Sequence, residues 1–165
     1  MTKAAPGTFS EDVERALQAS LEAHAGQTRK GGSIPYISHP VHVALLLARA
    51  GADDITLQAA LLHDVVEDCE GWTMERVIEE FGSAVARTVH DLTEVEGGSW
   101  EVRKQAALDQ VAHMGPRSLA VKTADKLHNM QSLLTRLSEA SDPGQVWKVF
   151  SRGLRFNTRS AWRTR

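Results

Sequence analysis

Apolar residues recur along most of this chain with the spacing of amphipathic helices. Val13, Ala16, Leu17 and Leu21, for example, would form one stripe on a helix that begins after Ser10. No segment alternates strictly between apolar and polar positions, so little or no sheet is expected. The pattern therefore predicts an all-α fold of about seven or eight helices.

Glycine, proline and capping residues divide this pattern into separate helices. Pro40 is expected to open the second helix at its first position, and Gly51 to end it. The third helix is predicted to run unbroken through residues 53–69, and a short fourth from Thr73 to Gly82. The other predicted helices cover residues 83–95, 100–113, 117–140 and 145 onward. We expect the third and seventh helices to form the centre of the fold.

Length and composition suit a single domain over residues 1–165, with flexible tails at 1–8 and about 157–165. The net charge of −2 provides no general attraction to nucleic acid, so neither DNA nor RNA is expected as a partner. The longest apolar run, residues 43–48, is too short to cross a membrane. One cysteine, Cys69, and an N-terminus without an apolar signal region favour a cytoplasmic protein.

The segment LLHDVVEDC, residues 61–69, places four ionisable side chains in an otherwise apolar stretch. On a continuous helix His63 would lie beside Glu67, and Asp64 beside Asp68. A solvated acidic face is the usual explanation for such a run of charges. An internal carboxylate is costly without a partner, however, and a bound cation would provide one.

Two further segments carry polar groups of the same kind. In VKTADKLHNM, residues 121–130, Asp125 and Asn129 lie one helical turn apart and away from the apolar stripe. Taken alone, Asp125 is equally well explained as a surface residue of an amphipathic helix. In PYISHP, His39 precedes Pro40, where the chain is extended and a helix is about to begin. Taken alone, His39 would be a capping or packing residue.

Together the three segments supply two histidines and two carboxylates: His39, His63, Asp64 and Asp125. Imidazole and carboxylate without thiolate favour a borderline-to-hard divalent ion with open water positions, which can be Mn²⁺, Fe²⁺ or Zn²⁺. Such an ion lowers the pKa of bound water and makes it a nucleophile near neutral pH. Glu67 and Asp68, one turn further on, would steer this water or move protons at the leaving group.

The segments RKGGSIPYISHP, LLHDVVEDC and VKTADKLHNM resemble, in this order and spacing, the hydrolase domain of the RelA/SpoT-homologue family. That family belongs to the HD superfamily of metal-dependent phosphohydrolases, and the resemblance covers about residues 24–135. It implies a single HD-type helical domain that hydrolyses the 3′-pyrophosphate of guanosine 3′,5′-bis(diphosphate) (ppGpp), usually with Mn²⁺. Because 165 residues leave no room for synthetase and regulatory domains, we expect a small alarmone hydrolase.

The resemblance also assigns roles to individual residues. It implies metal ligation by His39, His63, Asp64 and Asp125, catalysis by Glu67 and Asp68, and nucleotide contacts by Arg29, Lys30 and Asn129. Arg103 and Lys104 match the phosphate-facing residues of metazoan-type small hydrolases less closely. The loop after Lys30 is one residue longer than in common bacterial members, which bears on the shape of the base pocket.

Two other functions stay open at this point. One is an HD phosphohydrolase that acts on a different nucleotide, such as removal of the 2′-phosphate of NADPH. The other is a non-catalytic nucleotide-sensing module, although a pure binder would not need the intact pair Glu67 and Asp68. A guanosine polyphosphate is the expected small-molecule partner, and a homodimer is left open.

Overall fold

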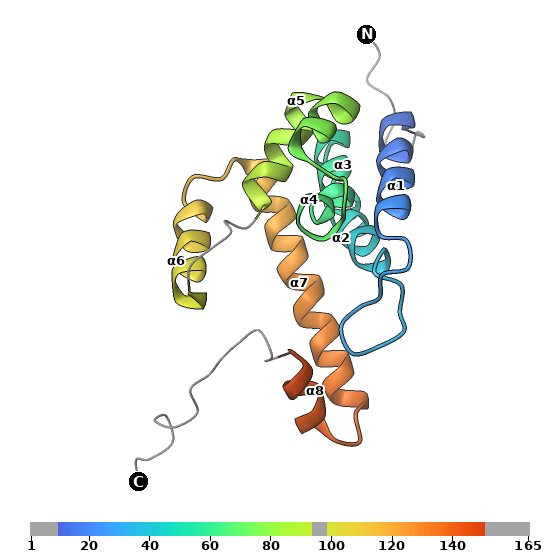
Figure 1. Ribbon diagram of the computed structural model, residues 1–165, viewed down its shortest axis with the longest axis vertical. Coiled ribbons are helices and arrows are strands. Elements are labelled where there is room, and N and C mark those ends of the chain that lie inside the picture. Colours follow the sequence, from blue (N-terminus) through green and yellow to red (C-terminus); the bar gives the residue numbers. More distant parts are fainter. Residues whose placement is uncertain (1–9, 94–98, 151–165) are drawn as a thin grey trace.

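The computed structural model describes residues 10–93 and 99–150, and over these residues it is all-helical (Figure 1). Within the described residues, the β-structure is limited to an isolated antiparallel bridge between Thr28 and Pro35. The prediction of an all-α fold is confirmed, whereas both predicted tails lie outside the described residues. The helices are α1 (Glu11–Ala23), α2 (Ser38–Arg49), α3 (Asp54–Leu62), α4 (Val65–Asp68), α5 (Met74–Leu92), α6 (Trp100–Val111), α7 (Pro116–Glu139) and α8 (Pro143–Phe150).

Most helix starts follow the capping residues of the sequence. Four N-cap side chains each accept a hydrogen bond from the backbone N–H three residues later: Ser10, Asp53, Thr73 and Ser99. Each bond satisfies a backbone donor that has no partner within the helix. The helix α2 is an exception, because it begins at Ser38, so its proline is in the first turn but not at the first position. The other helix boundaries, apart from the end of the predicted third helix, lie within a few residues of the predicted ones.

Gly82 interrupts α5, as the sequence predicted. Its φ of 82° and ψ of 164° fall in a region that is essentially open to glycine alone. The two halves of α5 therefore run in different directions, which lets both of them cover the same core.

The predicted third helix is wrong in one respect, because the chain does not stay helical from residue 53 to 69. The helix α3 ends at Leu62, and the single turn α4 begins at Val65. Consecutive side chains on a continuous helix point about 100° apart. His63 and Asp64 lie in the junction between the two helices, and Nε2 of His63 is 3.2 Å from Oδ2 of Asp64.

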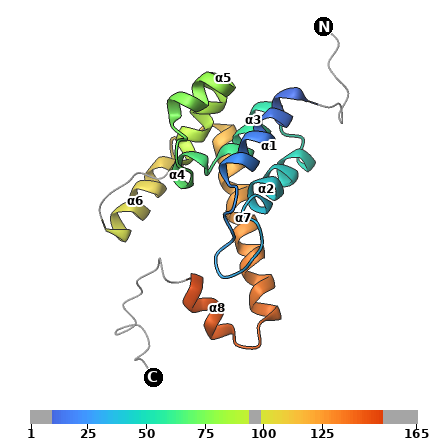
Figure 2. The ribbon, with the colours of Figure 1, turned by 45° about the vertical axis from the view of Figure 1, so that its right-hand side comes forward.

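The helices α3 and α7 form the centre of the fold, as expected. The helix α3 packs against α1, α2, α5 and α7, and α7 also contacts α2, α5 and α8. Figures 1 and 2 show α7 extending well beyond the other central helices, with α8 at its far end and α6 to one side. The junction between α3 and α4 thus faces the middle of α7.

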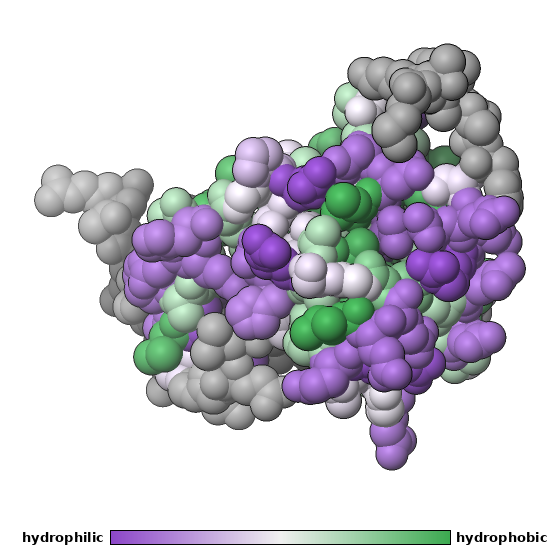
Figure 3. All heavy atoms as spheres, turned by 90° about the horizontal axis from the view of Figure 1, so that it is seen from above, coloured by the Kyte–Doolittle hydropathy of each residue, from purple (hydrophilic) through white to green (hydrophobic). Residues whose placement is uncertain are grey.

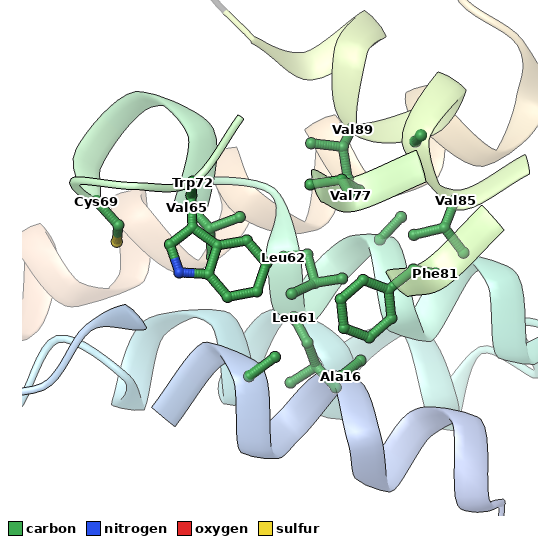
Figure 4. Close-up of a cluster of buried hydrophobic side chains, with 13 residues drawn as sticks. Ala16, Leu61, Leu62, Val65, Cys69, Trp72, Val77, Phe81, Val85 and Val89 are labelled. Carbon is green, nitrogen blue, oxygen red and sulfur yellow. The ribbon is translucent and has the colours of Figure 1, made fainter. Parts of the chain in front are cut away.

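Residues of α3 belong to two hydrophobic clusters. Leu61 and Leu62 lie in the first cluster, with Trp72 and Phe81, whose ring centroids are 6.4 Å apart (Figure 4). Ala60 lies in the second cluster. Its other members come from α2, α5 and α7: Val43, Leu47, Leu92, Val121 and Ala124. Three consecutive residues of α3 are therefore fixed just before the junction.

The molecular surface is mixed in character. In the view of Figure 3, hydrophobic residues form small areas separated by hydrophilic ones, which is ordinary for a folded domain. Among the described helices, none has both the length and the apolar character that a membrane span requires.

Asp53 joins the start of α3 to the start of α7. Its Oδ1 accepts from the backbone N–H of Thr56 at 3.0 Å. Its Oδ2 accepts from Nη2 and Nε of Arg117 at 2.6 and 2.9 Å. The hydrogen bonds from Arg117 are the main cause of a lowered pKa for Asp53. The side chains of Asp53 and Arg117 are each about half exposed. Their ion pair is one of the links that fix α7 against α3.

Replacing Asp53 with Ala should lower the free energy of unfolding by about 1–2 kcal/mol, because the helix cap and the ion pair are both lost. Arg117→Met keeps the cap and should cost less, at most about 1 kcal/mol for an exposed pair. Since the folded pKa of Asp53 is depressed, the pair stabilises the fold above the unfolded pKa of about 4. The difference between wild type and Arg117→Met should shrink as pH falls below that value. Urea unfolding at pH 7 and at pH 3 measures both effects. An equal loss for both variants would contradict the separate role of the cap.

Candidate functional site

Three segments far apart in the sequence meet at one buried point. His39 comes from the first turn of α2, His63 from the end of α3, and Asp125 from the middle of α7. All three are buried, and one ligand atom from each lies within 4.8 Å of the others. The structure therefore brings together three of the four residues that the sequence suggested as metal ligands.

Asp64, the fourth of these residues, borders the same point. Its Oδ2 lies 3.2 Å from Nε2 of His63 and 3.7 Å from Nε2 of His39. Nε2 of His39 is in turn 3.3 Å from Oδ1 of Asp125. Two imidazole nitrogens and two carboxylates thus face one another.

The rings are oriented from behind by contacts with their other nitrogens. Nδ1 of His63 lies 2.7 Å from the carbonyl oxygen of Ala60, so it carries the proton and donates, and Nε2 keeps its lone pair. Nδ1 of His39 lies 2.6 Å from Nδ1 of His128, whose Nε2 lies 3.4 Å from Oγ of Ser132. A proton on Nδ1 of His39, donated to His128, leaves the lone pair on Nε2 of His39. Such outer contacts are typical of metal-binding histidines.

The residues present fit a divalent cation. Nε2 of His63 is buried and forms no hydrogen bond within the described residues, although Oδ2 of Asp64 lies 3.2 Å away. A buried polar atom normally has a hydrogen-bond partner. Nε2 of His63 points at two carboxylates and a second imidazole, and no thiolate takes part. Nitrogen and carboxylate oxygen donors of this kind suit Mn²⁺, Fe²⁺ or Zn²⁺.

The protonation states match those that metal binding needs. Burial lowers the pKa of His39, so the imidazole is neutral near pH 7. Burial acts to raise the pKa of Asp125, but its contacts with His39 and Lys126 outweigh burial and hold the pKa below the usual value. Neutral imidazole and ionised carboxylate are the forms that bind a metal.

Tyr36 connects this point to Asp68. Its hydroxyl donates to Oδ2 of Asp64 at 2.6 Å and lies 3.3 Å from Oδ2 of Asp68. Burial, followed by the charge of Asp64, raises the pKa of Tyr36, so the phenol stays protonated and remains a donor. Gln27 fixes the backbone at the same place, since its Nε2 donates to the carbonyl of Asp68 at 2.8 Å. Asp68 is therefore held through its side chain and through its main chain.

Arg29 and Asn129, both predicted to contact nucleotide, are bonded to each other. Nη2 of Arg29 donates to Oδ1 of Asn129 at 2.7 Å. Nδ2 of Asn129 donates to Oδ1 of Asp125 at 2.5 Å. The Arg29 guanidinium also lies 5.5 Å from the ring centroid of Tyr36. A continuous chain of contacts thus runs from the loop before α2 to the buried carboxylate of Asp125.

The loop that carries Arg29 is clamped by α7. The Arg136 guanidinium donates to the carbonyl oxygens of Lys30 and Gly31. Gly31 has a φ of 72°, and a Cβ there would lie 2.7 Å from Nη2 of Arg136. Glycine is therefore needed both for the turn and for the clamp. Lys30 itself is exposed.

The remaining predicted site residues are more exposed. Glu67 and Asp68 are exposed on α4. Glu67 lines a hollow beside the buried ligands, whose other walls are His63, Asp64, Leu92, Lys122, Asp125 and Lys126. Arg103 and Lys104 are exposed on α6 and do not line this hollow, so their contact with phosphate stays a prediction.

A family model described as HD domain matches residues 16–150, which is most of the chain. The chain belongs to the HD domain family. The match spans every residue of the site described above. The HD domain together with the cluster of His39, His63 and Asp125 indicates binding of a divalent metal ion.

Two similar proteins show more closely which HD-domain proteins this chain resembles. A probable GTP pyrophosphokinase of Mycobacterium leprae (strain TN) is 42% identical over 125 residues, covering 73% of this chain and 16% of that protein. A guanosine-3′,5′-bis(diphosphate) 3′-pyrophosphohydrolase of Vibrio cholerae is 40% identical over 129 residues, covering 74% of this chain and 18% of that protein. The chain thus spans less than a fifth of the length of these two relatives.

Solved structures agree with this relationship. A metazoan ortholog of SpoT, described as hydrolyzing ppGpp with a role in starvation responses, has a TM-score of 0.72 at 28% identity. The match covers 88% of this chain and 84% of that one. A protein from Listeria monocytogenes EGD-e has a TM-score of 0.62 at 40% identity, covering 70% of this chain and 73% of that one. The expected resemblance to RelA/SpoT-homologue hydrolases is confirmed.

Sequence reasoning did not assign a role to several residues that orient this HD-domain site. These residues are Gln27, Tyr36 and His128. Tyr36 lies three residues before His39 in the same PYISHP segment, which was a usable signal. For Gln27 and His128 the contacts depend on tertiary structure, which spacing along the chain does not reveal.

Replacing Tyr36 with Phe should weaken metal binding by roughly 10-fold or more, because Asp64 loses the donor that orients it. The ring contacts to Arg29 and His24 remain in this variant. Tyr36→Leu removes both the hydroxyl and the ring, and comparison of the two variants separates these roles. Calorimetric titration of Mn²⁺ into each variant measures its affinity for the metal. Equal affinity in wild type and Tyr36→Phe would leave the hydroxyl without a part in ligand orientation.

Proposed function

We propose that this chain is a metal-dependent ppGpp 3′-pyrophosphohydrolase that uses Mn²⁺ and releases pyrophosphate. Water adds to the phosphorus attached to the ribose 3′ oxygen, and the bond between that phosphorus and oxygen breaks. The products are GDP and pyrophosphate. The same chemistry on the pentaphosphate would give GTP and pyrophosphate.

The observation that carries the proposal is the connected site itself. A buried set of two histidines and a carboxylate is joined through Asn129 to Arg29. Such a site combines a place for a metal with the planar, cationic guanidinium of Arg29. A guanidinium can stack on a nucleobase or pair with the phosphates of a nucleotide. The ppGpp hydrolase activity described for the metazoan structural relative adds support, because this chain covers 84% of that protein.

The proposed ligands are His39, His63, Asp64 and Asp125. A divalent ion held by them would supply a Lewis acid that polarises phosphoryl oxygens and lowers the pKa of water. The protein contributes the alignment of these side chains. Ala60 and His128 fix the two imidazole rings, and Tyr36 fixes Asp64.

Glu67 and Asp68 are the proposed catalytic pair. Glu67 lines the hollow next to His63 and Asp64, so its carboxylate is well placed to accept the proton of the attacking water. Asp68, held by Tyr36 and Gln27, would then protonate the ribose 3′ oxygen as it leaves.

The nucleoside end is assigned to Arg29, Lys30 and Asn129. Arg29 would stack on the base while Asn129 contacts the sugar, and the exposed Lys30 would meet the 5′-phosphates. Arg103 and Lys104 on α6 are proposed as further phosphate contacts. Binding energy from these distant groups would position the reacting phosphorus.

Hydrolysis of ppGpp, its pentaphosphate and NADPH by the Mn²⁺-supplied protein tests the function. We expect pyrophosphate and GDP from ppGpp. Inorganic phosphate from NADPH in its place would favour the 2′-phosphatase alternative, and binding without turnover of any nucleotide would favour a sensing module. Product analysis by anion-exchange chromatography distinguishes these outcomes.

Glu67→Gln should lower kcat for ppGpp by roughly 10²–10⁴-fold, the range for loss of a general acid or base. Metal content should stay near that of wild type, because Glu67 is not among the proposed ligands. Glu70→Gln is the matched control, since Glu70 is exposed three residues further along the chain. It should keep wild-type turnover. Full activity in Glu67→Gln would remove this residue from the mechanism.

Arg29→Ala should lower kcat/KM for ppGpp by about 10-fold or more and reduce the preference for guanosine over adenosine polyphosphates. Metal content should change little. Arg49→Ala, at the exposed end of α2, removes the same charge at a distance and should behave as wild type. Steady-state kinetics on both nucleotides provides the measurement. Unchanged kcat/KM in Arg29→Ala would argue that the arginine only braces Asn129.

A further inference from the structure

His24 is a buried histidine that has no part in the metal site or in the proposed reaction as described so far. It closes α1, where its backbone N–H donates to the carbonyl oxygen of Ser20 at 3.1 Å. Only 3% of the residue is exposed, and its Nε2 forms no hydrogen bond within the described residues. Burial of a polar ring has a cost that its other contacts must offset. Those contacts lead to the turn that carries Glu67 and Asp68.

The side-chain amide of Gln27 joins His24 to that turn. Oε1 of Gln27 lies 2.9 Å from Nδ1 of His24, and Nε2 of Gln27 donates to the carbonyl oxygen of Asp68 at 2.8 Å. Because a carbonyl can only accept, the amide nitrogen faces Asp68 and the amide oxygen faces the histidine. Nδ1 of His24 therefore carries the proton and donates to Gln27. A path of two hydrogen bonds thus runs from the end of α1 to the last residue of α4.

The turn α4 depends on support of this kind because it is so short. A single helical turn gains few hydrogen bonds for the backbone freedom that it loses. The N–H groups of Asp68 and Cys69 donate to the carbonyl oxygens of Asp64 and Val65 at 2.9 and 3.1 Å. Val65 is fully buried and anchors the start of α4, whereas Glu67 and Asp68 near its end are exposed. The last carbonyls of a helix have no partner within it, so a donor from outside fixes the end of the turn.

His24 also lies beside the thiol of Cys69, with 3.3 Å between Nδ1 and Sγ. A thiol next to an imidazole can form a nucleophilic pair. Here burial raises the pKa of Cys69, which is the opposite of what an activated thiol needs. Nδ1 already carries a proton that it donates to Gln27, so it does not act as a base towards the thiol. The contact instead packs His24 against the residue that follows Asp68.

A second line of support runs through the ring of His24. The ring packs against Tyr36, with 4.7 Å between the ring centroids and 32° between the planes. The hydroxyl of Tyr36 donates to Asp64 and lies 3.3 Å from Oδ2 of Asp68. Its backbone N–H donates to the carbonyl oxygen of Gln27 at 2.9 Å. His24 thus contacts both residues that hold Asp68, one at the main chain and one at the side chain.

We propose that His24 is a positioning residue for α4, which fixes the backbone of Asp68 through Gln27 and so aligns the carboxylates of Glu67 and Asp68. Its effect on turnover rests on the proposed function, whereas its hold on α4 does not. Misplacement of a reacting group by about 1 Å can cost on the order of 100-fold in rate. The three buried metal ligands lie on α2, α3 and α7, so they should stay in place without it.

Two substitutions separate the donor of His24 from its ring. His24→Phe keeps a ring against Tyr36 but has no donor for Gln27, and His24→Asn has an amide N–H in the place of Nδ1 but no ring. His24→Phe should lower kcat for ppGpp by about 10–100-fold, with little change in KM or in Mn²⁺ affinity. His24→Asn should restore most of kcat. A histidine needed only for packing would give the reverse order.

Amide hydrogen exchange on the Mn²⁺-loaded full chain reports on α4 without any turnover. The amides of Asp68 and Cys69 should exchange about 10-fold faster or more in His24→Phe, since a hydrogen bond that holds the turn is lost. In His24→Asn they should exchange as in wild type. Gln27→Leu removes the linking amide and should have the same effect as His24→Phe. The double variant should add little to either single change, because both break one path.

His90→Phe is the matched control, since it replaces an exposed histidine of α5. It should keep the exchange and the kcat of wild type. Gln27→Leu carries the test if His24→Phe does not fold. Unchanged exchange at Asp68 and Cys69 in the folded variants would overturn the positioning role, whether or not wild type hydrolyses ppGpp. Faster exchange in a protein whose wild type leaves ppGpp intact would uphold the hold on α4 and reject the proposed function.

Discussion

An ionised carboxylate inside a helical core is the constraint on which the rest of this structure depends. Asp125 is 8% exposed, yet its contacts keep it charged. A charge at this depth requires compensation, or its burial would destabilise the fold. His39, Asn129 and Lys126 are arranged around it, and each of them also takes part in the wider site. The packing of α2 and α3 against α7 is therefore tied to the same groups that would hold a metal.

The junction between α3 and α4 shows how packing serves this constraint. The sequence predicts a helical segment with mixed character, and its charged residues suggested a site. It does not reveal that the helix breaks after Leu62. The residues just before the break are packed in two hydrophobic clusters, Leu61 and Leu62 in one and Ala60 in the other. These are tertiary effects, which override the local preference for a continuous helix.

Local chemistry predicted the fold well because most boundaries depend on nearby residues. Ser10 and Thr73 cap helices, and Gly82 redirects one, through contacts within a few positions. The three segments of the candidate site were likewise visible as polar groups in apolar surroundings. The supporting contacts of Gln27, Tyr36 and His128 were not, because they join residues 28 to 89 positions apart. Periodicity carries no information about such pairs.

The clamp of Arg136 on the loop at Lys30 and Gly31 has a consequence for synthesis of the chain. A nascent polypeptide emerges from the ribosome with His39 and His63 well before Asp125, Asn129 and Arg136. Until α7 has followed, the loop lacks its contacts with Arg136, and the two imidazoles lack the buried carboxylate of Asp125. A truncated product of translation would therefore retain neither half of the site in working form. The contacts of this loop with Arg136 and the cluster of His39, His63 and Asp125 therefore form together, late in translation, once α7 is complete.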